Sequence, residues 1–148
     1  MRVLVPIDGS EYSMKALEKG KEIAEKYNGE IILTNIQKRI VSRPKPMSMD
    51  YDIGKFIEDD PNILHERGQQ VLEKGLEKLK GSSVKVAICL LIGDPAEEIL
   101  ECAKRNEADM IVIGSLGLTG ISKFLIGSVS SKVVNNAHIP VMVVKKND

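Results

Sequence analysis

The chain has 148 residues, with 21 Lys plus Arg and 21 Asp plus Glu, so its formal net charge at pH 7 is zero. This length is typical of one domain with one core, and we expect a single domain over residues 1–148. A balanced charge provides no overall field that attracts nucleic acid or an anionic membrane. Aromatic residues make up only 3% and Trp is absent, which excludes a stacking platform for nucleic acid and predicts an aliphatic core.

No apolar run approaches the length that crosses a bilayer, and a strand pattern begins directly after Met1 and Arg2, without room for a signal peptide. We therefore expect a cytoplasmic protein. Cys89 and Cys102 lack a Cys-x-x-Cys spacing, which favours small buried residues over redox or metal chemistry. The two histidines also lack metal-ligand spacing, so no histidine metal site is expected.

The first part of the chain alternates strand and helix patterns. Residues 3–7 form an apolar run typical of a strand buried on both faces, and a helical period follows from 11 to about 27. Ser10 is a predicted N-cap of this helix, and a second strand is expected at 30–37. Residues 38–60 form a long polar connection without a period, which favours a lid, a partner surface or a mobile segment, with a plain insertion as an equal alternative.

The same alternation continues to the end of the chain. Asp60 and Asp94 each precede a proline, a pattern that predicts a capped helix start. The remaining strands are expected at 84–91, near an edge of the sheet, at 110–113 and at 141–144, with a short helix from 129 to 137. Alternating strands and helices with right-handed crossovers predict an open α/β fold, a parallel sheet with helices on both faces.

A glycine-rich loop lies between the fourth strand and the last helix. Gly114, Gly117, Gly120 and Gly127 have no Cβ and can adopt positive φ, so their N–H groups can converge on an oxyanion. Ser128 is a predicted N-cap that would direct the positive end of the following helix to the same point. The loop therefore predicts a phosphate-bearing ligand. A plain strand-to-helix connection would be the better interpretation of the glycines alone.

This loop is neither a P-loop nor a dinucleotide fingerprint, because the lysine motif and the Gly-x-Gly start are both absent. Its spacing, Gly-x-x-Gly, nine residues, Gly-Ser, resembles the loop of ATP-binding members of the universal stress protein family. The resemblance extends over essentially the whole chain, from residues 3–10 to residues 140–144. It implies the strand order 3-2-1-4-5 in a Rossmann-like sheet, similar to that of the adenine nucleotide alpha hydrolases.

The resemblance also implies an ATP site at the switch point between strands 1 and 4. Asp8 would contact the ribose or hold hydrated magnesium, and Ile36 would contact adenine. The implied nucleotide-binding residues are Pro6, Asp8, Ser10, Ile36, Gly114, Ser115, Gly117, Gly120, Gly127, Ser128 and Val129. Without the resemblance, Asp8 is a turn residue and Ile36 is ordinary core.

The chain departs from many relatives at Leu116 and Leu118, where those relatives carry basic residues or histidine. Lys123, Arg39 or Arg43 are alternative cations for the phosphates, and the choice among ATP, ADP and AMP stays open. Strand 5, formed by Val141, Met142, Val143 and Val144, is apolar on both faces at a sheet edge and predicts a homodimer. The alternative is protection of this edge by the C-terminal residues and a neighbouring loop.

The sequence lacks a recognisable phosphoryl-transfer apparatus, since no motif places a histidine or an arginine at the site. A nucleotide-dependent regulatory switch with an unidentified protein partner is therefore favoured over an enzyme, and slow ATP hydrolysis stays open. One alternative is a dimeric interaction protein of the same fold that uses no nucleotide. Another, an adenylate-forming or pyrophosphatase-like enzyme, would need more glycine than residues 8–13 contain.

Overall fold

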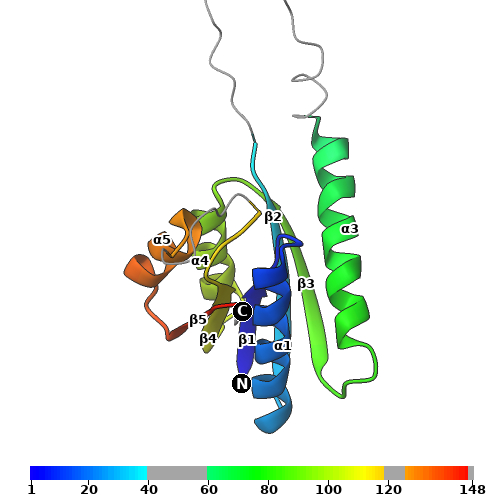
Figure 1. Ribbon diagram of the computed structural model, residues 1–148, viewed down its shortest axis with the longest axis vertical. Helices are drawn as coiled ribbons and strands as arrows, with labels where there is room; N and C mark the ends of the chain where they lie inside the picture. The colour runs from blue at the N-terminus through cyan, green and yellow to red at the C-terminus, as the bar shows by residue number, and fades with distance from the viewer. Residues whose placement is uncertain (40–59, 119–125, 147–148) are drawn as a thin grey trace, which may run out of the picture.

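In the computed structural model, residues 1–39, 60–118 and 126–146 are described. Five strands form one parallel sheet in the order β3-β2-β1-β4-β5 (Figure 1). The strands are β1 (Arg2–Pro6), β2 (Glu30–Gln37), β3 (Lys85–Ile92), β4 (Met110–Gly114) and β5 (Val141–Val144). The helices are α1 (Glu11–Lys26), α3 (Pro61–Leu79), α4 (Pro95–Arg105) and α5 (Ser128–Asn136). The predicted α/β class and strand order are both confirmed.

The sheet lies between two helical layers, because alternate residues of each buried strand face opposite sides. Helices α1 and α3 pack on one face, and α4 and α5 pack on the other (Figure 1). On β1, Val3 and Val5 belong to the first core, whereas Leu4 belongs to the second. As the composition predicted, the cores are aliphatic.

The predicted helix starts at Ser10, Asp60 and Asp94 are confirmed. The Ser10 side chain accepts a hydrogen bond from the Ser13 N–H at 3.2 Å, which caps α1. Asp60 accepts from the Asn62 N–H at 2.8 Å, and Asp94 accepts from the Glu97 N–H at 3.2 Å. These side chains satisfy backbone donors that have no acceptor within the helix.

Helix α5 differs from the predicted apolar face. Val133 is fully buried, but Val134 is 43% exposed. The helix has only nine residues and packs against α4 and β5, so it buries a narrower stripe than the sequence period suggested.

The two sheet edges are β3 and β5, as expected. Strand β5 pairs only with β4 among the described strands, and Met142 on it is 37% exposed. None of the helices within the described ranges combines the length and apolar character needed to cross a bilayer.

Close packing of α1 on β1 depends on Gly20. A Cβ added at this glycine would lie 2.6 Å from the Cγ2 atom of Val5, a fully buried and β-branched residue. Because such a side chain has few rotamers, it cannot readily move aside.

We therefore expect Gly20→Ala to lower the free energy of unfolding by about 1 kcal/mol. Overpacking typically costs about 1–3 kcal/mol, and the better helix propensity of Ala offsets about 1 kcal/mol of this. Urea denaturation measures the change. Lys19→Ala, at the neighbouring half-exposed position of α1, is the control; it removes only a surface ion pair with Glu22 and should change stability by less than about 0.5 kcal/mol. A Gly20→Ala variant more stable than the wild type would contradict this packing argument.

Candidate functional site

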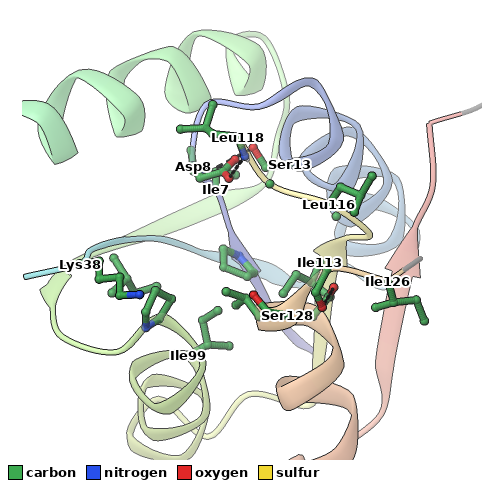
Figure 2. A pocket seen from close by; sticks show the side chains of 18 residues that line it. Ile7, Asp8, Ser13, Lys38, Ile99, Ile113, Leu116, Leu118, Ile126 and Ser128 are labelled. Atoms are coloured by element: carbon green, nitrogen blue, oxygen red, sulfur yellow. Dashed lines mark hydrogen bonds between the residues drawn. The ribbon is translucent and has the colours of Figure 1, made fainter. Parts of the chain in front are cut away.

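A cavity of about 610 Å³ opens at the carboxyl ends of β1, β2 and β4 (Figure 2). Its position follows from the topology, because the helices after β1 and β4 cover opposite faces of the sheet and the chain diverges between them. The volume is within the range of small-molecule sites, about 300–1,000 Å³. Most of its walls are apolar, with Ile36, Ile99 and Ile113 among the side chains that line it.

The structure brings much of the predicted site to this cavity. The predicted residues that line it are Pro6, Asp8, Ile36, Gly114, Gly117, Gly127, Ser128 and Val129. Ser10 and Ser115 are buried and do not line it. Gly120, like the alternative cations Lys123 and Arg43, lies outside the described residues, and Arg39 is exposed away from the lining.

Asp8 connects the turn after β1 to the loop after β4. Its Oδ1 atom accepts from the Ser10 N–H at 2.9 Å. Its Oδ2 atom accepts from the Leu118 N–H at 3.1 Å (Figure 2). The carboxylate lies so close to Gly117 that an added Cβ there would be 2.6 Å from Oδ2. The half-buried carboxylate therefore holds together two loops that are distant in sequence.

The three described glycines of the loop, Gly114, Gly117 and Gly127, are required for space and not for positive φ, which corrects the sequence prediction for these positions. Among the described glycines, only Gly9 and Gly81 have positive φ. A Cβ on Gly114 would lie 2.8 Å from the backbone of Tyr12, because β4 ends against the first turn of α1. At Gly127 the nearest atom would be the Ser115 carbonyl oxygen, at 3.2 Å.

The predicted N-cap role of Ser128 is wrong. Helix α5 begins at Ser128, so the cap position belongs to Gly127, and no side chain makes a cap hydrogen bond there. The Ser130 hydroxyl donates to the carbonyls of Gly127 and Ser115, at 3.0 Å and 3.1 Å, and fixes the helix start against the loop. The first N–H groups of α5, including those of Ser128 and Val129, have no acceptor within the helix and lie at the cavity.

Sequence reasoning missed several lining residues. Lys38 follows β2 directly, and it is the one cation among the described lining residues. Parallel strands end at the same edge of a sheet, so its place after a predicted strand was a usable signal. Ile99 and Pro95 come from α4, whose helical period indicated a core face but not a cavity wall. Within the described ranges, no three His, Cys, Asp or Glu side chains are grouped as metal ligands.

Comparison with known proteins decides the family. The model of the universal stress protein family matches residues 1–145. The chain belongs to this family. Universal stress protein MJ0531 of Methanocaldococcus jannaschii is 33% identical to it, over 98% of this chain and 82% of that protein. The solved structure of MJ0577, from the same organism, is 28% identical with a TM-score of 0.79, and the match covers 99% of this chain and 96% of that one.

Two more distant structures share the fold and contain adenine nucleotides. A universal stress protein in complex with cAMP has a TM-score of 0.66 at 23% identity, and the match covers 97% of this chain and 95% of that one. A protein of Archaeoglobus fulgidus in complex with dAMP has a TM-score of 0.64 at 20% identity, with 98% of each chain covered. At these identities the likeness establishes the fold of the present chain.

We expect Asp8→Ala to release the loop after β4, because it removes the acceptor of the Leu118 N–H. A hydrogen bond to a charged group contributes about 1.5–3 kcal/mol, so amide exchange at Leu118 should accelerate roughly tenfold or more. Hydrogen exchange followed by NMR measures this rate. Glu11→Ala removes an exposed carboxylate from the same segment and should leave the Leu118 rate unchanged. Equal rates in Asp8→Ala and wild type would show that the contact does not hold the loop.

Proposed function

We propose that this protein is a cytoplasmic, nucleotide-dependent regulatory switch that binds an adenine nucleotide in the 610 Å³ cavity. The observation that carries the proposal is the meeting of three features at one apolar cavity: the glycine loop, the Asp8 carboxylate and the start of α5. The adenine nucleotides in the two more distant structures of this fold support the same ligand class.

The lining suggests where each part of the nucleotide would bind. Adenine would lie against Ile36 and Ile99, because an apolar wall suits a flat aromatic base. The ribose hydroxyls would donate to Asp8, whose carboxylate oxygens are acceptors. The phosphates would accept from the N–H groups of Ser128 and Val129, where the positive end of the α5 dipole favours an anion. The Gly127 N–H already donates to the Ser115 carbonyl at 2.7 Å.

Asp8 and Lys38 are the only charged groups among the described lining residues, and their opposite charges leave the phosphate charge unbalanced. As the alternative to a ribose contact, we propose that Asp8 holds Mg²⁺ through its hydration shell, since a carboxylate near phosphates needs a cation between them. Backbone donors and Mg²⁺ would then balance most of the phosphate charge. ATP, ADP and AMP, each with and without Mg²⁺, should be compared directly.

The switch would act through the two loops that Asp8 joins. A nucleotide bound between the Asp8 turn and the start of α5 would order the loop after β4 and change the surface offered to a partner protein. The predicted role of the connection at 38–60 concerns mostly residues outside the described ranges. We propose regulation as the main activity, with ATP hydrolysis slow or absent.

A homodimer through β5 completes the proposal. Val141, Met142, Val143 and Val144 form an edge strand, and an unpaired apolar edge pairs readily with the same edge of a second copy. The same dimer without nucleotide binding is the alternative function of this fold.

We expect Ser128→Asp to weaken Mg-ATP binding at least tenfold in calorimetric titration. At the first position of a helix an acidic residue is tolerated or stabilising, but its charge repels a nearby phosphate. Ser131→Asp is the matched control: it makes the same change on the same helix, outside the cavity lining, and should bind nearly as the wild type does. Wild-type binding should also stabilise the fold by about 2.7 kcal/mol when free ligand is a hundredfold above Kd.

If Ser128→Asp and Ser131→Asp weakened Mg-ATP binding equally, the phosphates would not lie at the start of α5. No wild-type binding of ATP, ADP or AMP at millimolar concentration would overturn the nucleotide proposal and favour the nucleotide-independent dimer.

For the dimer, we expect Met142→Lys to shift the protein towards the monomer in sedimentation equilibrium, because a lysine on an edge strand opposes pairing. Ile88→Lys is the matched control on the opposite edge strand β3, where Ile88 is 51% exposed. It should leave the association state unchanged. A dimer lost only in Ile88→Lys would move the interface to β3, and a monomeric wild type would overturn the dimer proposal.

A further inference from the structure

The fold brings the two cysteines of the chain together, although they lie on different elements. Cys89 is on edge strand β3 and Cys102 is on α4. Asn106 is the C-cap residue of α4. Its side-chain amide donates to both sulfurs, with Nδ2 to Sγ distances of 3.9 Å to Cys89 and 3.4 Å to Cys102. The same amide also donates to the Cys102 carbonyl at 2.8 Å, which fixes its position.

Neighbouring contacts confirm that both thiols lie between the sheet and α4. Thr34 on β2 is the register partner of Cys89, so the two side chains lie next to each other on the same face of the sheet. The Thr34 hydroxyl is also 3.7 Å from the Cys102 sulfur. Cys102 therefore packs directly over the strand pair that carries Cys89, and both belong to the core between the sheet and α4.

The two thiols differ in access. Cys102 is 1% exposed, whereas Cys89 is half-buried and lies at the sheet edge. The pKa of Cys102 is raised to about 11, mainly by burial; the hydrogen bond with Thr34 opposes the rise and the neighbouring Cys89 adds to it. Since the thiolate is the reactive form, a reagent in solution should react first at Cys89.

We propose that Cys89 and Cys102 are a redox modification site, which forms a reversible intramolecular disulfide by exchange with a small-molecule disulfide of the glutathione type. The sequence spacing favoured small buried residues over redox chemistry; in the structure Cys102 is buried and Cys89 is half-buried. The inference does not depend on the proposed nucleotide function.

The exchange has two balanced steps. The Cys89 thiolate attacks one sulfur of oxidised glutathione, the reagent's S–S bond breaks, and one glutathione thiolate leaves. Cys102 then loses its proton to solvent and attacks the Cys89 sulfur, which releases the second glutathione thiolate. Two protein thiols are oxidised to one disulfide, and one glutathione disulfide is reduced to two thiols, which take up the two protons.

The bond would connect α4 covalently to β3. Ile99, which lines the cavity, lies about one helical turn before Cys102 on the same helix. Oxidation would therefore limit the motion of the α4 wall, and amide exchange in α4 should slow relative to the reduced protein.

The test treats the reduced, folded full chain with excess oxidised glutathione, followed by acid quench, alkylation of free thiols and intact-mass measurement. We expect a monomer that lacks two hydrogens, retains no glutathione and has no alkylated cysteine. A wild-type product that keeps a glutathione, that is linked to a second chain, or that forms the internal bond only in denaturant would overturn the proposal.

Two single variants separate the roles of the thiols. Cys102→Ser should accumulate one glutathione on Cys89, because the resolving thiol is missing. Cys89→Ser should react at least about tenfold more slowly, because its remaining thiol is buried and protonated. If circular dichroism shows that Cys102→Ser does not fold normally, Cys102→Ala replaces it in the same experiment. Rapid modification of Cys102 in folded Cys89→Ser would contradict the assigned order of attack.

Discussion

The parallel pairing of β1 with β4 determines where the candidate site lies. Val3 aligns with Met110 and Leu4 with Ile111, which brings the ends of two strands together at the centre of the sheet. The chain after β1 enters α1 on one face, and the chain after β4 leads to α5 on the other. The backbone cannot cover the gap that this divergence leaves, so a cavity forms there whichever ligand occupies it.

The features that the sequence predicted best are those with local causes. Ser10, Asp60 and Asp94 cap helices through hydrogen bonds within three residues, so their signal is contained in a few consecutive positions. Ser128 had the same local pattern but not the role, because the hydroxyl of Ser130 holds the loop carbonyls and the helix begins one residue earlier than predicted. The choice between two serines depends on the path of the loop, which is a tertiary property.

In the glycine loop, the structural reason for the described glycines differs from the one that the sequence suggested. Its glycines were expected to supply positive φ. Instead, a side chain at Gly114 would collide with α1, and a side chain at Gly117 would collide with the Asp8 carboxylate. Both neighbours are distant in sequence, so no local pattern could reveal them. Contacts between distant elements also hid the proximity of Cys89 to Cys102, which requires the register of β3 on β2 and the packing of α4 together.

The two leucines of the loop change how the site would select a phosphate. Leu116 is buried, so a charged side chain at this position would lose its hydration. Leu118 contributes its N–H to Asp8, a contact that any residue except proline could make. In the proposed nucleotide complex, the phosphates would rely mainly on backbone donors, whose directions are set by the fold. Such donors recognise an oxyanion by geometry, so the close packing at Gly114, Gly117 and Gly127 would be the basis of specificity in that proposal.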